Sequence, residues 1–337
     1  MKEWLDSLIA TGSPPDFESS GDLQLDARNA SCETVIAPLM HLGLIQVQGD
    51  DALPFLHNLL TNDVNGLGEN DLRRAGFCTP KGRMLADFLI WLDAGGVTLQ
   101  LAADLLPPIL KKFSMYVLRS KVNLNDESNT FARVGLSGPQ ATKLLQQQGI
   151  PLPAPMRQQA FAAGVILGLA EQRFEIVVTA DKVAALWQAL SAGAKPVGIA
   201  AWRSFDIAAG IPQITAATSD TFVPQMVNFE LIGGVSFKKG CYPGQEIVAR
   251  THYLGKVKRR MYRAHVDIDS LSAGTSVYAP ETGDQVCGTV VTTAPVAGGG
   301  IDLLFSAQSS CVTAGEIHLC DPVGPIAKSL LLPYLIG

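Results

Sequence analysis

The chain has 337 residues, of which 47% are hydrophobic and 17% are charged, and its formal net charge is −5. This composition excludes a wholly disordered chain and gives no support to a broadly basic nucleic-acid-binding surface. The six cysteines lack paired spacing and the N-terminal residues show no signal peptide, so we expect free thiols in a reducing, cytoplasmic setting. The longest apolar run, residues 160–170, is far shorter than the roughly 20 residues that cross a bilayer.

Residues 1–34 are expected to form a lead-in with one short helix. The patterns that follow predict one half of an α+β body over about residues 43–125. Its expected elements are strands at 44–47, 74–79, 84–91, 97–102 and 121–124, a helix after Gly49-Asp50-Asp51 through Leu60, and a second helix that Asp104 caps.

The same order recurs over residues 131–210. The expected elements are strands at 131–137, 164–170 and 174–179, and helices at 139–148, 181–192 and 201–210. Gly49, Ala52 and Leu56 correspond to Gly138, Ala141 and Leu145 at a constant offset. This recurrence predicts an internal duplication of a split β-α-β unit, with a cleft between the halves that binds a small ligand.

From residue 256 onward, short alternating strands and glycine-rich turns predict a small β-barrel over 256–337, without a convincing helix. The preceding body, including the loop described next, would span 35–255. Five Lys and Arg residues fall between Lys256 and Arg263. A solvated charged edge strand explains them best, and contact with RNA phosphates or an acidic partner is the alternative.

Residues 233–246 contain four glycines and a proline, which predicts a shaped loop because such residues destabilise helix and strand interiors. Gly240 and Gly244 can adopt positive φ and allow the backbone to approach a ligand. Pro243 is placed to open a helix over 245–250. Cys241 would then lie beside Lys239 and just before a helix N-terminus, which favours the reactive thiolate. A buried structural cysteine is the alternative.

Other polar and aromatic residues carry weaker signals. Trp202 suits either core packing or stacking on a planar heterocycle. His252 lies eleven residues after Cys241, too far along a helix to support a Cys-His dyad. No metal site is expected, because the spacing typical of zinc ligands is missing among Cys287, Cys311, His318 and Cys320.

The loop sequence Lys238-Lys239-Gly240-Cys241-Tyr242, with residues 222–225, 233–237 and 244–246, resembles the signature of the YgfZ-type proteins. These are folate-binding relatives of the glycine cleavage system T protein, associated with iron-sulfur cluster assembly or repair and with tRNA modification. Residues 59–64 and 81–83 extend the similarity. The resemblance implies an α+β fold: a duplicated, T-protein-like, folate-binding body and a small C-terminal β-barrel.

The resemblance also implies functional residues. It places a catalytic pair at Cys241 and Lys239, with the thiol reactive or able to serve as a transient iron-sulfur ligand. The implied cofactor is tetrahydrofolate or a one-carbon derivative. Its predicted contacts are Trp202, Asn62, Lys81, Arg83, Asp87, Lys239, Tyr242 and Gln245.

Four positions depart from the family patterns. Leu42 stands where a second folate-contacting tryptophan is expected, and Ala86 replaces an acidic neighbour of Asp87. Trp202 and Ala208 replace an arginine and a glutamate of the T protein. These losses argue against aminomethyl transfer from glycine.

The predicted function is therefore that of a tetrahydrofolate-binding accessory protein that supports iron-sulfur enzymes, and through them tRNA modification. Its expected partners are folate and iron-sulfur enzymes or assembly factors, and a monomer is expected. A folate-dependent one-carbon transferase is the alternative. An RNA-binding module is the second alternative, although direct nucleic-acid binding is not expected.

Overall fold

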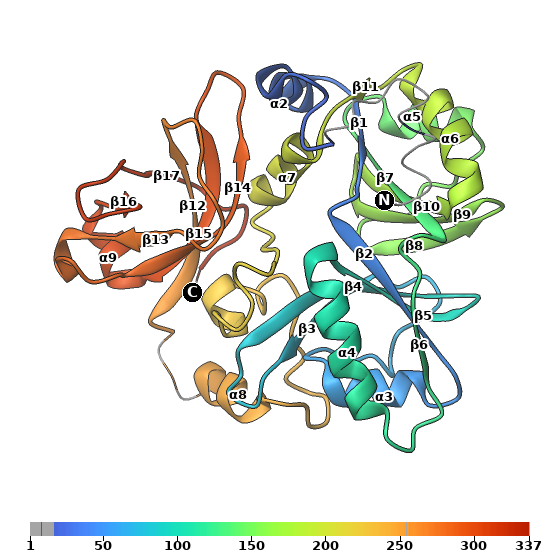
Figure 1. Cartoon of the computed structure of the whole chain (residues 1–337), viewed down its shortest axis with the longest axis horizontal. Coiled ribbons are helices and arrows are strands. Elements are labelled where there is room, and N and C mark those ends of the chain that lie inside the picture. Colours follow the sequence, from blue (N-terminus) through green and yellow to red (C-terminus); the bar gives the residue numbers. More distant parts are fainter. Residues whose placement is uncertain (1–7, 9–16, 254, 256, 337) are drawn as a thin grey trace. The chain divides into compact units, whose positions relative to one another are not determined.

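The computed structural model describes residue 8 and residues 17–253, 255 and 257–336. Most of the predicted lead-in before residue 17, together with Lys256, therefore lies outside the described residues. Contacts divide the chain into two compact units, which Figure 1 shows as ribbons. Unit 1 comprises Met1–Phe55, Val64–Arg73 and Phe88–Trp202, and unit 2 comprises Leu56–Asp63, Arg74–Asp87 and Arg203–Gly337. The domain boundaries proposed from the sequence stay a prediction.

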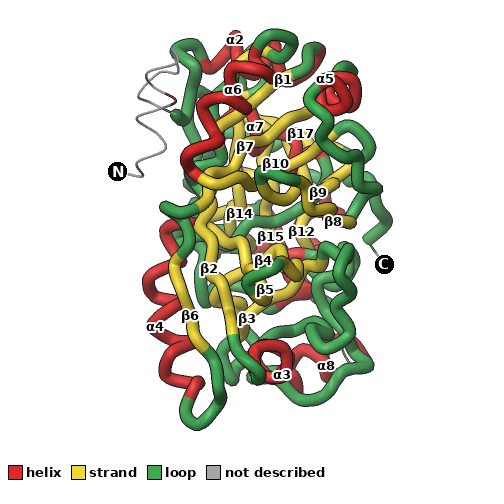
Figure 2. The backbone as a smooth tube through the Cα atoms, turned by 90° about the vertical axis from the view of Figure 1, so that its right-hand side faces the viewer, coloured by secondary structure: helices red, strands yellow, loops and turns green. Residues whose placement is uncertain are grey.

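Unit 1 contains a six-stranded sheet of order β11-β1-β7-β10-β9-β8, in which β7, β10, β9 and β8 run side by side (Figure 2). Helices α5 (Ala141–Gln147) and α6 (Val183–Ser191) cover one face, where Leu145 and Trp187 share a buried core with the strands. Helix α2 (Leu23–Cys32) precedes the sheet. The strands are β1 (Val35–Pro38), β7 (Phe131–Ser137), β8 (Arg157–Phe161), β9 (Gly164–Ala170), β10 (Arg173–Thr179) and β11 (Lys195–Pro196).

A five-stranded sheet has the order β3-β4-β5-β2-β6. Helices α3 (Ala52–Leu59) and α4 (Leu106–Val117) alternate with its strands in the chain. The ring centroid of Phe113 in α4 lies 6.2 Å from that of Phe55 and 5.9 Å from that of Phe88. These aromatic contacts fix both helices against β4. The strands are β2 (Leu42–Gln48), β3 (Arg73–Cys78), β4 (Met84–Asp93), β5 (Gly96–Ala102) and β6 (Asn123–Asp126).

The two sheets confirm the predicted duplication. The orders β3-β4-β5-β2 and β8-β9-β10-β7 are equivalent, and each half carries its helices at the same places in the chain. Gly49 and Gly138 both adopt positive φ, 112° and 121°. A Cβ at either position would lie within 2.4 Å of a backbone carbonyl oxygen, so both turns require glycine.

The C-terminal region of unit 2 is an antiparallel sheet that forms a half-barrel, of order β16-β13-β14-β15-β12-β17. Val290, Leu303 and Phe305 belong to its core. Helices α7 (Ile199–Ala208), shared between the units, and α8 (Gln245–Tyr253) precede it. The strands are β12 (Arg259–Val266), β13 (Ser276–Tyr278), β14 (Gly288–Pro295), β15 (Ile301–Gln308), β16 (His318–Leu319) and β17 (Lys328–Leu330).

Two local expectations about helices were wrong. Asp104 does not cap α4, because a 3-10 turn over Ala103–Leu105 comes first and puts Leu105 at the N-cap. The barrel does contain a helix, α9 (Ser309–Ala314), whose serines and threonine are weak helix formers. Among the described residues, no helix has the length and apolar character required to cross a membrane.

Candidate functional site

The signature loop is bonded to the segment that follows α3. Thr61 Oγ1 donates to the carbonyl oxygen of Gly234 at 2.6 Å and accepts from the amide of Gly76 in β3 at 2.7 Å. The backbone of Thr61 also bonds the loop, since its carbonyl accepts from Ser236 N at 2.9 Å. Gly234 is required here, because a Cβ would lie 2.3 Å from the ring of Phe229.

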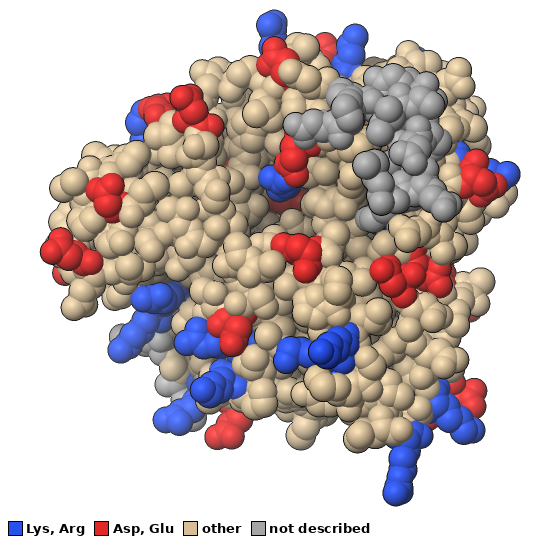
Figure 3. All heavy atoms as spheres, in the orientation of Figure 1, with Lys and Arg blue, Asp and Glu red and all other residues tan. Residues whose placement is uncertain are grey.

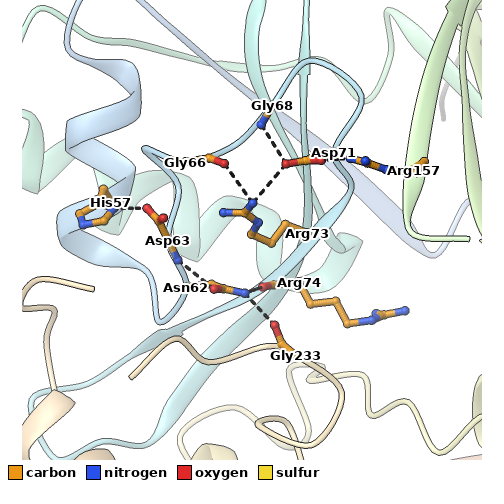
Figure 4. Close-up of polar contacts among 10 residues, drawn as sticks. All are labelled: His57, Asn62, Asp63, Gly66, Gly68, Asp71, Arg73, Arg74, Arg157 and Gly233. Atoms are coloured by element: carbon orange, nitrogen blue, oxygen red, sulfur yellow. Dashed lines mark hydrogen bonds and ion pairs between the residues drawn. The ribbon is translucent and has the colours of Figure 1, made fainter. Parts of the chain in front are cut away.

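Asn62 forms a second connection between the loop and β3. Its amide nitrogen donates to the carbonyls of Arg74 and Gly233, both at 2.7 Å, and its oxygen accepts from Asp63 N (Figure 4). Both amide hydrogens are therefore used within the protein. The structure gives Asn62 a role in holding the loop, and its predicted contact with folate stays a prediction.

Lys239 turns inward from this loop. Its Nζ donates to the carbonyl oxygens of His57 and Leu60, the latter at 2.7 Å, and lies 4.8 Å from the centre of the Tyr242 ring. Burial lowers the pKa of Lys239 to about 8, against the opposing charges of Asp63 and Cys241. Lys239 therefore joins the end of α3 to the loop and places a cationic nitrogen beside the cysteine.

Cys241 is exposed and precedes α8, the helix predicted from Pro243 and Gln245. Gly244 has a φ of +80°, and a Cβ there would lie 2.4 Å from the carbonyl oxygen of Thr79. Gly240, which was expected to be able to adopt positive φ, is not among the positive-φ residues. The exposed thiol is thus held between a half-buried lysine and a helix start.

Tyr242 and Gln245 lie beside the thiol at the start of α8. Tyr242 is 6% exposed, and burial raises its pKa above the usual range. The backbone N–H of Gln245 donates to the backbone carbonyl of Tyr242 at 3.1 Å. The structure therefore brings together Asn62, Lys239, Cys241, Tyr242 and Gln245 of the predicted set.

A His-Asp pair at the same place was missed by the sequence analysis. His57 Nδ1 lies 3.1 Å from Asp63 Oδ1, and a Cβ built on Gly240 would lie 3.8 Å from His57 Nε2. Burial, then Lys239, lower the pKa of His57, and Asp63 opposes them. His252, the histidine considered from the sequence, instead stacks on Phe237 at 3.8 Å between ring centroids. The similarity of residues 59–64 to the family was a signal for Asp63, but none pointed to His57.

Three predicted folate contacts lie on or after the turn between β3 and β4. Lys81 is exposed, and Arg83 donates to the carbonyl of Thr221 at 2.6 Å. Asp87 accepts from the amide of Ile214 at 2.6 Å, and burial raises the pKa of Asp87 to about 6. Of these three groups, the half-buried Asp87 is the one with a pKa displaced towards neutrality.

Trp202 is buried in unit 1, with a side chain that is 1% exposed. The guanidinium of Arg173 lies 4.7 Å from the centre of its ring, and a Cβ on Gly135 would lie 2.7 Å from ring atoms. This placement agrees with the core-packing alternative. Contact between Trp202 and folate stays a prediction.

A hollow of about 450 Å³ lies in unit 1 between the inner faces of the two sheets, in the part of the fold where a ligand cleft was expected. Trp91, Phe131, Phe161, Val165 and Val177 form much of its apolar wall. None of the residues predicted to contact folate lines it.

The basic strand is a charged edge only in part, because β17 pairs with residues 263–265 of β12, whereas residues 259–262 have β15 as their one paired strand among the described residues. Arg260 is 8% exposed and pairs with Glu230, and Arg263 pairs with Asp302 at 2.7 Å. Lys258 remains exposed. Figure 3 shows further Lys and Arg side chains gathered over the region of α8.

Two of the three cysteines in the barrel region are structural in placement. Cys287 and Cys311 are buried, and burial raises the pKa of Cys287 to about 12. His318 interacts with Glu316 and the carbonyl of Gly324, at 2.8 and 2.9 Å. Within the ranges that the structure describes, no group of three or more His, Cys, Asp or Glu side chains could hold a metal ion.

Comparison with solved structures shows the fold. The chain matches the glycine cleavage system aminomethyltransferase T from Bartonella henselae with a TM-score of 0.75 at 18% identity, covering 93% of this chain and 89% of that one. The predicted T-protein-like fold is therefore confirmed.

Comparison of sequences shows the family. The family model for the GCVT N-terminal domain matches residues 18–161. The tRNA-modifying protein YgfZ of Colwellia psychrerythraea is 31% identical, over 75% of this chain and 78% of that protein. The tRNA-modifying protein YgfZ of Edwardsiella ictaluri is also 31% identical, over 86% and 89%. The chain therefore belongs to the YgfZ family.

Proposed function

We propose that this protein binds a reduced folate and, through the thiol of Cys241, supports tRNA modification by iron-sulfur enzymes. The names of its relatives support the link to tRNA modification, and the matching GCVT domain supports the link to folate. The observation that carries the proposal is the geometry of the loop. Cys241 is exposed there, and two backbone carbonyl oxygens fix Lys239, which lies two residues before it.

The loop can present a thiol without being mobile itself. Thr61, Asn62 and Lys239 bond it to the end of α3 and to β3, and Gly244 brings it against the turn at Thr79. A cation beside a cysteine favours the anionic sulfur, which is the form that attacks electrophiles or binds metals. Cys241 is therefore suited to react with, or transiently ligate, a group that a partner protein brings.

The residues present fit a reduced folate best at Asp87. A carboxyl group with a pKa of about 6 can accept or donate a hydrogen bond near neutral pH, which suits the amine edge of a reduced pterin. When bound, tetrahydrofolate would supply a carrier for one-carbon units. We propose the other predicted contacts, including Lys81, Arg83 and Trp202, as part of the same binding function.

A one-carbon transferase is less well supported. Ala86, Trp202 and Ala208 replace the acidic and basic side chains that the resemblance to the T protein leads one to expect. We therefore propose an accessory role, for a cytoplasmic monomer that acts with iron-sulfur enzymes or their assembly factors.

The test uses cells that lack this protein. Cys241→Ser should fail to restore the nucleoside made by an iron-sulfur tRNA-modifying enzyme, measured by mass spectrometry of tRNA digests. Cys32→Ser, which changes another exposed cysteine, should restore it. Both variants should bind tetrahydrofolate in calorimetry. Full rescue by Cys241→Ser at normal expression would refute the role of the thiol, and formaldehyde release from methylene-tetrahydrofolate would support the transferase alternative.

A further inference from the structure

We propose that His57 is the proton acceptor for the thiol of Cys241, with Asp63 as the residue that orients its ring. The inference rests on the proposed role of Cys241 and adds its acid-base partner. The arrangement follows the logic of nucleophile, histidine and carboxylate, which recurs on unrelated folds and is identified by geometry rather than by sequence position.

Asp63 fixes the orientation of the His57 imidazole. His57 lies in the last turn of α3, and its Nδ1 is 3.1 Å from Asp63 Oδ1 (Figure 4). A carboxylate only accepts hydrogen bonds, so in the neutral ring Nδ1 carries the hydrogen. The lone pair that can take up a proton is then on Nε2.

Nε2 of His57 lies close to the loop at Gly240. A Cβ built on Gly240 would lie 3.8 Å from His57 Nε2, and Gly240 directly precedes Cys241. The acceptor nitrogen therefore faces the backbone that carries the thiol. Gly240 places no side chain of its own between the loop backbone and this nitrogen.

Burial and a nearby cation favour the neutral imidazole of His57. The ionisable groups that act on the ring are Asp63, which follows its own helix, and Lys239 on the loop. Cys241 acts on Lys239, Tyr242 lies beneath Lys239, and Cys78 is near Tyr242. Burial and Lys239 lower the pKa of His57, so the imidazole is neutral and able to accept at neutral pH. Lys239 is the nearby cation for the sulfur that remains.

The transfer is balanced without a further reactant. The S–H bond of Cys241 breaks, its electron pair stays on sulfur, and an N–H bond forms at His57 Nε2. The resulting imidazolium is beside the Asp63 carboxylate, and the thiolate is beside the Lys239 ammonium. Each new charge thus has an opposite charge near it.

Other bases near the loop are engaged elsewhere. His252 stacks on Phe237, at 3.8 Å between ring centroids. Lys239 donates to two carbonyl oxygens and is the cation of the group rather than its base.

The experiment measures alkylation of individual cysteines by iodoacetamide in the full chain, from about pH 5.5 to pH 9, by peptide mass spectrometry. In the wild type at about pH 6.5, Cys241 should react at least about fivefold faster than the exposed Cys32 and Cys320. His57→Gln should lower the Cys241 rate at least about fivefold at that pH and much less at about pH 9, where hydroxide replaces the base.

Two further variants separate acid-base chemistry from loop structure. Asp63→Asn should give an intermediate pH profile, because the ring loses the acceptor that fixes its tautomer. His252→Gln should leave the profile of the wild type unchanged. Thermal unfolding of each variant checks that the fold is intact.

An unchanged pH profile in folded His57→Gln, or an equal change in His252→Gln, would overturn the inference. Its outcome is independent of the tRNA assay. If Cys241→Ser restores tRNA modification while His57→Gln alters the alkylation profile, the His57-Cys241 pair stands and the proposed function falls.

Discussion

Gly135 in β7 faces the ring of Trp202 so closely that a Cβ on the glycine would lie 2.7 Å from Cη2 and from Cζ3. The ring is 1% exposed, and its distance to the Arg173 guanidinium is 4.7 Å. The indole therefore fills a space that exists because position 135 has no side chain. A buried ring in this position stabilises unit 1 whether or not it also contacts a ligand.

Gly135→Ala should destabilise the protein by about 1–3 kcal/mol, because the added methyl group forces the indole to move. Urea unfolding followed by circular dichroism measures this change. In a Trp202→Phe background the smaller ring should relieve much of the overlap, so the two changes should not be additive. An equal cost of Gly135→Ala in both backgrounds would show that the ring is not its cause.

Asp87 should make stability fall as the pH rises through the weakly acidic range. Its pKa is about 6 in the folded protein and about 3.9 in an unfolded chain. Between these values the folded state holds a proton that the unfolded state has lost, so the free energy of unfolding decreases with pH. The Asp87 proton contributes on the order of 1–3 kcal/mol to the free energy of unfolding. This contribution is fully present below about pH 4 and is lost as the pH rises through 6.

Asp87→Asn keeps an acceptor for Ile214 N and should remove this pH dependence. Urea unfolding at several pH values from about 4 to 7.5 compares the variant with the wild type. Asp284→Asn, at an exposed carboxylate, is the matched control. Parallel stability curves for wild type and Asp87→Asn would show that Asp87 titrates alike in both states.

Much of the fold could be predicted because its signals are local. The alternation of residues 131–137 matches β7, and residues 164–170 match β9. The repeated Gly49 and Gly138 identified the duplication because each occupies a turn that only glycine tolerates. By contrast, β8 (Arg157–Phe161) was missed, since its polar sequence lacks the hydrophobic alternation of a half-buried strand.

The candidate site was only half predictable. Glycines and charges around Cys241 identify a shaped loop from its own sequence. The His57-Asp63 pair belongs to the end of a helix far away in the chain, and only the fold brings Gly240 to His57 Nε2. Likewise, the sequence around Arg260 indicates its charge, whereas the neighbours of β12 decide that this side chain is buried.

Glu230 and Arg260 form a buried ion pair, with side chains 6% and 10% exposed. Glu230→Gln should destabilise unit 2 by about 3–5 kcal/mol, because it leaves the guanidinium without a counter-charge. The double variant Glu230→Met with Arg260→Met should recover much of that loss, since no buried charge remains. Thermal and urea unfolding measure both. A double variant less stable than Glu230→Gln would contradict this account.

We expect no salt-sensitive tRNA binding through the basic strand. Its charges are best tested by replacing the exposed Lys258 and the half-buried Arg259 together with Ala, which spares the buried Arg260 and should leave the fold intact. Fluorescence anisotropy with labelled tRNA, at about 50 and 200 mM salt, is the measurement. A tight wild-type complex that weakens steeply with salt and is lost in the double variant would favour the RNA-binding alternative.

Lys239 should give the opposite pH dependence from Asp87, at alkaline pH. Its pKa is about 8 in the folded protein and about 10.4 in an unfolded chain. Between these values the unfolded state binds the additional proton, so the free energy of unfolding rises with pH. The contribution is present above about pH 10.4 and is lost as the pH falls through 8.

Lys239→Met should remove this rise, whereas Lys238→Met, at the exposed neighbour, should retain it. The difference in the free energy of unfolding between the two variants should change by about 1–2 kcal/mol from pH 7.5 to 9.5. This figure is reduced for solvent screening, because Lys239 is only half-buried. Urea unfolding of both variants across that range measures it. Lys239→Met should also give a partial defect in the tRNA assay, because the loop loses its bonds to His57 and Leu60 and the thiol loses its nearby cation. If both variants show the same pH dependence, Lys239 does not carry a displaced titration, and its role is limited to anchoring the loop.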